Sequence, residues 1–95
     1  MRFEWDEAKE EINIKKHKID FTTASYVFDD DNRLEVFDAK HSIDEKRYIT
    51  IGAVNQTLVI LAVVYTERGR KTRIISARKA TAKERRMYYD NLQGH

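Results

Sequence analysis

The longest apolar run in the chain, Leu58–Tyr65, constrains the fold more than any other feature. It reads LVILAVVY, so a strand formed there would be apolar on both of its faces. The run is too short to span a membrane as a helix, which takes about 18 to 20 apolar residues. We therefore expect it to be the central strand of a sheet.

Three further segments have the pattern of strands and are separated by turn-forming residues. The predicted strands are Leu34–Phe37, Lys46–Gly52 and Thr72–Arg78. Asn55-Gln56 and Glu67-Arg68-Gly69-Arg70 mark the turns on either side of the central strand. A short strand at the start, around Phe3 and Trp5, is left open.

Two helices are predicted before these strands. Asp6 can cap a first helix that runs to about Lys18, with Ala8 and Ile12 on its inner face. Asp20 can cap a second helix, in which four apolar residues have helical spacing. These residues are Phe21, Ala24, Val27 and Phe28.

A final helix is predicted after the last strand, because Thr81 and Glu84 have the spacing of a capping box. The order is thus two helices, four strands and one helix. It predicts one α+β domain over residues 1–95, with a four-stranded antiparallel sheet, helices packed on one face and the other face free to meet a partner. A composition with 41% hydrophobic and 36% charged residues is that of a soluble globular protein.

The net charge of +2 conceals a strong asymmetry along the chain. Residues 66–88 carry nine basic and two acidic residues, a net +7, whereas residues 20–45 carry two basic and eight acidic ones, a net −6. A basic surface suits a polyanion such as nucleic acid, because binding to phosphates releases condensed counterions. The alternative is that two oppositely charged faces merely attract each other.

The sequence lacks the motifs of several kinds of catalytic and binding site. There is no cysteine, hence no disulfide or thiolate, and we expect a cytosolic protein without a membrane partner. The histidines at 17, 41 and 95 match no metal-binding spacing, and no phosphate-binding glycine loop or nucleophile elbow is present. We therefore expect neither a metal nor another cofactor, and any chemistry would rest on cationic side chains and carboxylates.

Two arginines on the last strand are the first candidates. Simple alternation places Arg73 and Arg78 on opposite faces of the sheet, unless a bulge intervenes. Because Arg78 precedes a helix N-terminus, its guanidinium and the N–H groups near Thr81 could converge on one phosphate. Alternatively, Arg78 pairs with Glu84 as a structural clamp.

Glu45 and Arg47 share one face of the second predicted strand. RNA cleavage through the 2′-hydroxyl needs a base, a cation to stabilise the phosphorane and an acid for the leaving oxygen, and these residue types could serve. His17 lies on one face of the first helix with Lys9 and Asn13, and it either titrates near neutrality or is packed near the helix end.

Three groups of residues, in order and at characteristic spacing, carry a resemblance to a known family. They are Phe3-Glu4-Trp5-Asp6, Lys9, Asn13, Lys16-His17, Phe21, Ala24 and Phe28; then His41-Ser42, Glu45, Arg47 and Gly52; and last Arg73-Ile74-Ile75-Ser76-Ala77-Arg78-Lys79-Ala80, Glu84-Arg85 and Tyr88. Through them the chain resembles the BrnT family of bacterial toxins over nearly its whole length.

The resemblance implies a ribonuclease toxin of a type II toxin-antitoxin pair, with a compact fold similar to that of the RelE-like toxins. Such toxins cut RNA without a metal ion. It also implies a protein antitoxin similar to BrnA, a DNA-binding dimer, and a toxin-antitoxin complex that represses its own operon. Operator DNA would then be bound only through the antitoxin.

On this interpretation Arg47 and Arg78 would stabilise the charge of the transition state, while Glu45 and His17 are candidates for proton transfer. The RNA backbone would be held by Arg68, Arg73, Lys79, Arg85 and Arg86. Tyr88 would stack on a base or orient a phosphate, unless its helical spacing places it in the core.

Two hypotheses compete with the ribonuclease. In one, the basic face of residues 66–88 binds nucleic acid or an acidic protein and no bond is broken. In the other, the chain only completes a repressor complex.

Two positions depart from the family pattern. Lys18 stands where the family often has glycine at the end of the first helix, and a non-glycine residue in a left-handed cap costs on the order of 1 kcal/mol. Asp29-Asp30-Asp31 occupies a turn that often carries proline. Both changes affect loop geometry.

Overall fold

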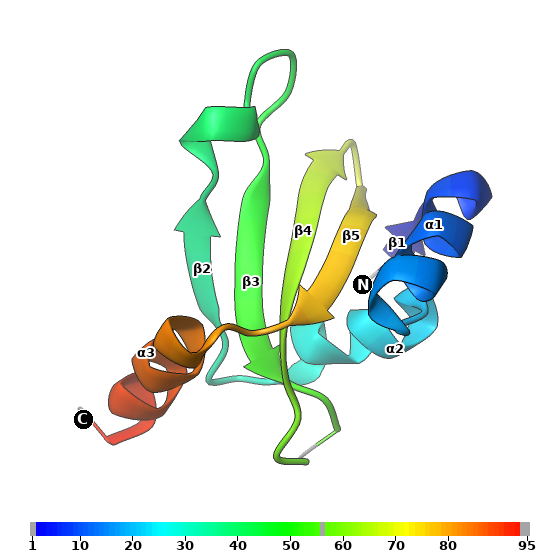
Figure 1. Cartoon of the computed structure of the whole chain (residues 1–95). Helices are drawn as coiled ribbons and strands as arrows, with labels where there is room; N and C mark the ends of the chain where they lie inside the picture. The colour runs from blue at the N-terminus through cyan, green and yellow to red at the C-terminus, as the bar shows by residue number, and fades with distance from the viewer. Residues whose placement is uncertain (1, 56, 94–95) are drawn as a thin grey trace.

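A mixed five-stranded sheet forms the centre of the computed structural model, which describes residues 2–55 and 57–93 (Figure 1). The strands are β1 (Arg2–Glu4), β2 (Leu34–Phe37), β3 (Tyr48–Ala53), β4 (Ile60–Arg68) and β5 (Lys71–Lys79). The helices are α1 (Glu7–His17), α2 (Phe21–Ser25) and α3 (Ala82–Gln93), with two 3-10 turns, η1 (Tyr26–Asp29) and η2 (Ala39–His41). The strand order is β1-β5-β4-β3-β2, so the long apolar run lies in the central strand β4.

The α+β class and the positions of the elements agree with the sequence, but the sheet differs from the one predicted. β2 to β5 form the expected antiparallel neighbours, and β1 adds a fifth strand that runs parallel to β5. The central strand begins at Ile60, because Leu58 is 87% exposed and lies in the preceding loop. Of the predicted Asn55-Gln56 turn, Asn55 has a positive φ of 47°, and Gln56 lies outside the described residues.

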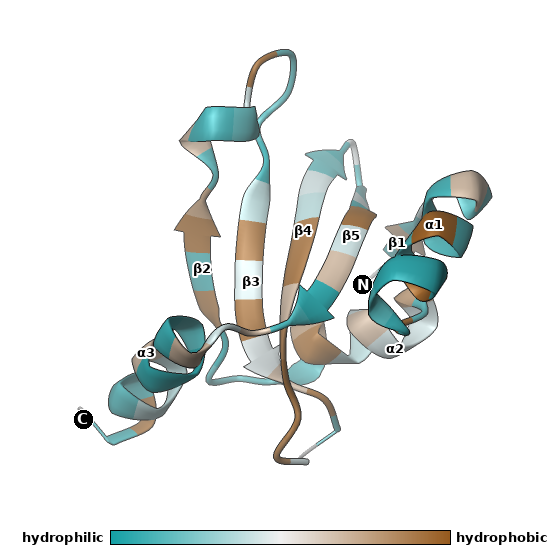
Figure 2. Ribbon diagram, in the orientation of Figure 1, coloured by the Kyte–Doolittle hydropathy of each residue, from teal (hydrophilic) through white to brown (hydrophobic). Residues whose placement is uncertain are grey.

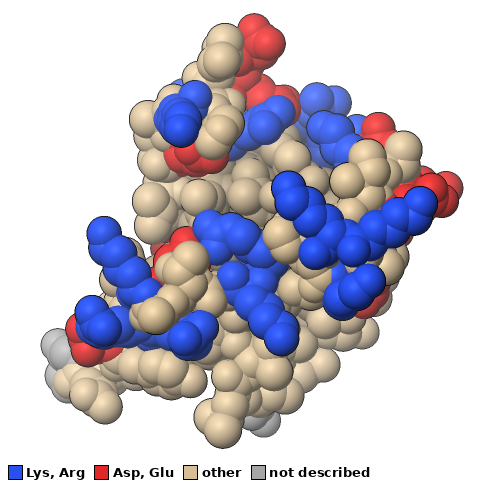
Figure 3. All heavy atoms as spheres, viewed as in Figure 1, with Lys and Arg blue, Asp and Glu red and all other residues tan. Residues whose placement is uncertain are grey.

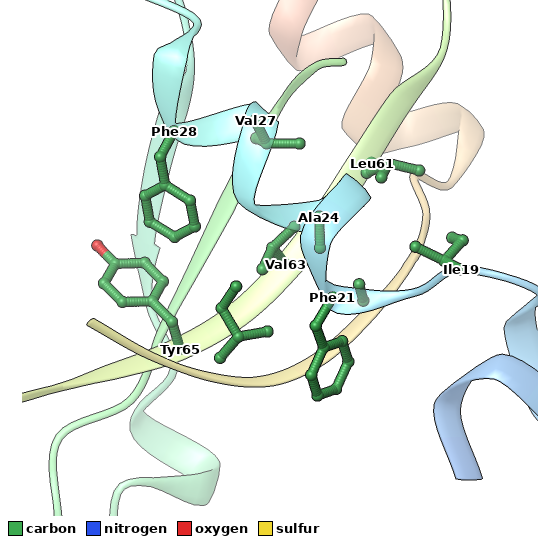
Figure 4. Packing of buried hydrophobic residues seen from close by; sticks show 10 residues of the cluster. Ile19, Phe21, Ala24, Val27, Phe28, Leu61, Val63 and Tyr65 are labelled. Carbon is green, nitrogen blue, oxygen red and sulfur yellow. The ribbon is translucent and has the colours of Figure 1, made fainter. Parts of the chain in front are cut away.

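The larger core lies between one face of the sheet and the segment of α2 and η1. Figure 4 shows Phe21 and Val27 from this segment among side chains such as Leu61 and Val63 of β4. Asp20 starts α2 as predicted, since its carboxylate accepts hydrogen bonds from the backbone N–H and the hydroxyl of Thr23. The predicted second helix tightens into η1 over its second half, a common ending for short helices.

Gly52 is required where this layer approaches β3. A Cβ atom at Gly52 would lie 2.9 Å from the Cβ of Arg33 and 3.0 Å from a methyl group of Val27. Any larger residue would therefore push η1 and the start of β2 away from the sheet.

The inner face predicted for the first helix is wrong. Ala8 is exposed and Ile12 is 64% exposed, whereas Asn13 is buried at 4%. The amide of Asn13 accepts a hydrogen bond from the N–H of Ala77 at 3.0 Å and donates one to the carbonyl of Ala77 at 2.9 Å. Because β1 pairs only with residues 71–73, this amide supplies at Ala77 the hydrogen bonds that a neighbouring strand would have made.

The turns that end α1 and β4 use left-handed backbone. Lys18, at the end of α1, has φ 63°, a left-handed conformation that glycine adopts at lower cost than lysine. Gly69, between β4 and β5, has φ 60°.

No helix within the described residues is long and apolar enough to cross a membrane.

The prediction that the helices pack on one face of the sheet is wrong, because α3 packs on the other face. Within residues 2–55 and 57–93, α3 covers one end of that face. Tyr88 and Ala80 contact a second apolar cluster that includes Ile51 and Ala62. In Figure 1, α3 lies across that end, and the rest of this face has no helix in front of it. Figure 2 shows apolar and polar residues side by side on these uncovered strands, and we call this uncovered surface the open face.

Candidate functional site

A β-bulge brings the two arginines of β5 to the same face of the sheet. Arg73 lies opposite Thr66 and Arg78 lies opposite Ala62, but the register shifts at Val64/Tyr65 of β4. The shift adds one residue to β5 between the two arginines, so the alternation that would have turned them apart is reset. Both side chains therefore belong to the open face.

Cross-strand partners form rows on this face. The middle row consists of Val36, Ile49, Val64 and Ser76, each in register with the next. Residues that follow one another by two positions along a strand are about 7 Å apart, and neighbouring strands about 5 Å apart. The middle row is thus a mainly apolar floor about 15 Å wide.

Arginines stand on both sides of this floor. On one side, Arg73 is the partner of Thr66, and continuing the β3–β4 register places Arg47 on the other side of Thr66. On the opposite side, Arg78 shares a row with Ala62 and Ile51. The three arginines therefore belong to one face of the sheet and stand on either side of its apolar floor.

Of the arginines at positions 47, 73 and 78, Arg47 is the one that forms no ion pair with a carboxylate of the described residues. Its Nε atom is buried and finds no hydrogen-bond partner among the described residues. No carboxylate in that part of the chain lies within 4.0 Å of its guanidinium, although its backbone is tied to Ser42 and Asp38. The residue as a whole is half-buried, so its guanidinium can be reached from solvent, and a bound anion could supply the missing acceptor.

Arg78 is held by a carboxylate from α3. Its Nη1 and Nη2 donate to the two oxygens of Glu84, at 2.7 and 3.0 Å. Glu84 also accepts the N–H of Thr81 at 2.8 Å, and its own N–H donates to the Thr81 hydroxyl, which confirms the capping box. The hydrogen bonds from Arg78 lower the pKa of Glu84 and raise the pKa of Arg78, in each case against burial. The predicted clamp is therefore present, and a carboxylate occupies the position suggested for a phosphate.

The two predicted proton-transfer residues do not meet. Glu45 pairs with Arg68 at 3.2 Å, in the loop that leads to Arg47. His17 lies one turn after Asn13 on α1, which packs against β5. β4 and β5 separate it from the strand that begins beside Arg47.

The remaining cationic residues form a broad surface. Figure 3 shows lysine and arginine side chains gathered across the open face, over β5 and α3. Arg73 pairs with Glu4 at 2.9 Å, Arg85 donates to the carbonyl of Ala80, and Arg86 is exposed. Lys79 is also exposed, but its cross-strand partner is Leu61, a residue of the larger core, so Lys79 lies on the opposite face of the sheet from Arg78. Backbone phosphates would meet several of these groups at once.

Tyr88 is a core residue in this structure. Its side chain is 4% exposed, and its hydroxyl donates to Asp30 at 2.5 Å. Burial and this hydrogen bond raise the pKa of Tyr88. Burial opposes the ionisation of Asp30, but the bonds from Tyr88 and from the N–H of Ala53 outweigh it and lower the pKa of that carboxyl. This geometry favours packing over base stacking for Tyr88.

An acidic pocket of about 640 Å³ lies away from the arginines, beside α3 and η1. Its lining includes Asp29, Asp31, Tyr26 and Leu92. Among residues 2–55 and 57–93, no three His, Cys, Asp or Glu side chains are grouped so that they could hold a metal ion.

Sequence reasoning missed one pair of side chains near Arg47. The Nδ1 atom of His41 lies 2.9 Å from one oxygen of Asp38 and 3.2 Å from the other. The spacing Asp-x-x-His between two strands was the available signal, since it brings these side chains together in a single turn.

A comparison with protein-family models identifies the family of the chain. A family model described as "Ribonuclease toxin, BrnT, of type II toxin-antitoxin system" matches residues 5–84. No curated protein matched the chain at a significant level. The matched range includes Arg47, the bulge and the Arg78–Glu84 pair. The chain therefore belongs to the BrnT family of ribonuclease toxins of type II toxin-antitoxin systems.

Proposed function

We propose that this toxin cleaves RNA on the open face, that the 2′-hydroxyl of the RNA is the nucleophile, and that no metal ion takes part. The observation that carries the proposal is that Arg47, Arg73 and Arg78 belong to one face of the sheet, on either side of one apolar floor. The family supplies the substrate class, and the arrangement of the arginines suggests where the reacting phosphate binds.

The chemistry follows from how charge changes during the reaction. The phosphorane carries more negative charge than the phosphodiester, so guanidinium groups that are already in place stabilise it more than the ground state. Arg47 is the best placed for this role because no carboxylate in the described chain neutralises it. Arg78 would join when a phosphate competes with Glu84 for its two donors.

The apolar floor would hold the nucleotide. Val36 is 38% exposed, and Ile49, Val64 and Ser76 are half-buried, so a base or ribose could lie against them without displacing core residues. Arg68, Arg85 and Arg86 would bind neighbouring phosphates, and these contacts would make affinity fall as salt rises.

A cleavage assay in EDTA tests this proposal. The purified toxin should cut single-stranded RNA in chelator and leave 2′,3′-cyclic phosphate or 3′-phosphate ends together with 5′-hydroxyl ends. Activity that EDTA abolishes and a divalent ion restores would contradict the mechanism. Tight binding of RNA without any turnover would favour a binding module instead.

We also propose that a BrnA-like antitoxin neutralises the toxin by covering the open face and α3 with an acidic segment. The support is the charge of this surface, since residues 66–88 carry a net +7. The same complex would repress the operon, with the DNA contacts supplied by the antitoxin.

Charge reversal tests the docking surface. Arg86 is exposed, so Arg86→Glu should slow association with the antitoxin and weaken the dependence of the rate on salt. Lys15→Glu on the exposed side of α1 makes the same change of charge as a control. Equal association rates for the two variants would place the docking surface elsewhere.

A further inference from the structure

The Asp38–His41 pair lies at the end of the row that contains Arg47. The N–H of Asp38 donates to the carbonyl of Arg47 at 2.9 Å, which extends the β2–β3 ladder by one residue pair. Asp38 and Arg47 are therefore cross-strand neighbours on the face that carries Val36 and Ile49. The carboxylate of Asp38 nevertheless binds His41 rather than the guanidinium beside it.

Ser42 fixes this turn on Arg47. Its hydroxyl donates to the carbonyl of Asp38 at 2.5 Å and accepts the N–H of Arg47 at 2.9 Å. The turn that carries His41 is thus joined at both ends to the start of β3. A change in the position of Arg47 would move the histidine with it.

The two side chains differ sharply in exposure. The Asp38 side chain is 13% exposed, whereas that of His41 is 59% exposed. A carboxylate that faces Nδ1 stabilises the tautomer that carries its proton there, so the lone pair of Nε2 is left free. This arrangement suits a histidine that takes a proton from a bound molecule.

We propose that His41 is the general base that accepts the proton of the 2′-hydroxyl, and that Asp38 is its positioning residue. This proposal rests on the proposed ribonuclease function. The other candidates are less well placed, because Glu45 is paired with Arg68 and His17 lies beyond β4 and β5. His41 is accessible, and the turn that carries it is hydrogen-bonded to the backbone of Arg47.

In the proposed reaction, the RNA is cleaved by its own 2′-hydroxyl group. Nε2 of His41 takes the proton while the 2′-oxygen forms a bond to phosphorus. The bond between phosphorus and the 5′-oxygen breaks, and its electron pair stays on that oxygen, which takes a proton from water. The products are a 2′,3′-cyclic phosphate and a 5′-hydroxyl, and the imidazolium returns its proton to solvent.

Single-turnover cleavage by the full chain tests the proposal. His41→Ala should lower the rate by about 10² to 10⁴, the range that general acid-base catalysis supplies, and imidazole added to the buffer should restore part of it. His41→Gln, which keeps a polar contact for Asp38, should be equally slow. Ile43→Ala is the control, because this neighbouring side chain is 86% exposed.

Asp38→Asn should slow cleavage less than His41→Ala, and the double variant should be no slower than His41→Ala, because Asp38 acts through the histidine. Unfolding midpoints of all variants show whether each is folded at the assay temperature.

The outcomes are distinct. A wild-type protein that fails to cut RNA contradicts the ribonuclease proposal itself. A wild-type protein that cuts, together with His41 variants that cut equally fast, overturns the role of His41. A folded His41→Ala variant whose lost activity imidazole does not restore also overturns it, because the histidine would then be structural.

Discussion

Arg78 is the residue for which a structural and a chemical role can be separated most sharply. Its guanidinium donates twice to Glu84, which also accepts the N–H of Thr81 at the start of α3. We therefore consider Arg78→Ala, Glu84→Gln and the double variant. Glutamine keeps an acceptor for Thr81, so Glu84→Gln removes the charge of the pair and preserves the helix cap.

The structure sets the expected loss of stability. The side chains of Arg78 and Glu84 are 34% and 17% exposed, so the pair is neither fully screened nor fully buried. Hydrogen bonds to charged groups contribute about 1.5–3 kcal/mol when buried, and exposed ion pairs about 0–1 kcal/mol. We expect each single variant to lose about 1–2 kcal/mol, or about 4–16 °C in Tm for a domain of this size. This is less than the 3–5 kcal/mol typical of breaking a fully buried pair.

Cleavage and stability should then respond differently. All three variants should lose similar stability in urea, because the second substitution removes nothing further from the pair. In single-turnover assays at a temperature where all are folded, Arg78→Ala should be slower by about 10² to 10³. Glu84→Gln should cut at least as fast as the wild type, since Arg78 is released toward RNA. An Arg78→Ala variant that unfolds easily yet cuts normally while folded would refute the catalytic role.

Three further predictions concern stability and use urea unfolding as the measurement. Lys18→Gly should raise the free energy of unfolding by about 0.5–1 kcal/mol, because Lys18 has φ 63°, and an unchanged midpoint would argue against strain there. Asn13→Leu should lower it by about 2–4 kcal/mol, because the N–H and the carbonyl of Ala77 would lose their partner, and a neutral result would mean that water replaces the amide. Stability should fall as pH drops below about 4, because the pKa values of Asp20, Asp30 and Glu84 are lowered in the folded state and the unfolded chain binds protons more strongly. The free energy of unfolding should depend less on pH in Glu84→Gln than in the wild type. An unchanged dependence would mean that Glu84 does not contribute to it.

Local sequence signals account for most of the fold. The caps at Asp6, Asp20 and Thr81 formed as predicted, because each depends on a side chain within three residues of the backbone that it binds. β1 was less visible, since a three-residue strand is stabilised by its distant partner β5. The inner face of α1 was misjudged because its partner is the backbone edge of β5, which binds the amide of Asn13 rather than an apolar side chain.

The site was less predictable than the fold. Residue types and spacing made Arg47 and Arg78 candidates and also predicted the alternative pairing of Arg78 with Glu84, which the structure contains. Placement of Arg73 on the same face required the bulge at Val64/Tyr65, which depends on how two strands pair. For the same reason, the order of residues alone predicts neither the contact between Asp38 and His41 nor the burial of the Arg47 Nε atom without a hydrogen-bond partner in the described part of the chain.

The most direct test of the account is whether RNA cleavage depends on the arginines of the open face. The measurement is the single-turnover rate in EDTA for the wild type, for Arg47→Ala/Arg78→Ala, and for Arg2→Ala/Lys15→Ala, which removes the same charge from exposed positions on β1 and α1. The account predicts that the first double variant binds RNA but cuts it at least 10³-fold more slowly, while the second keeps the rate of the wild type. Equal rates for the two double variants, with both proteins folded, would contradict it.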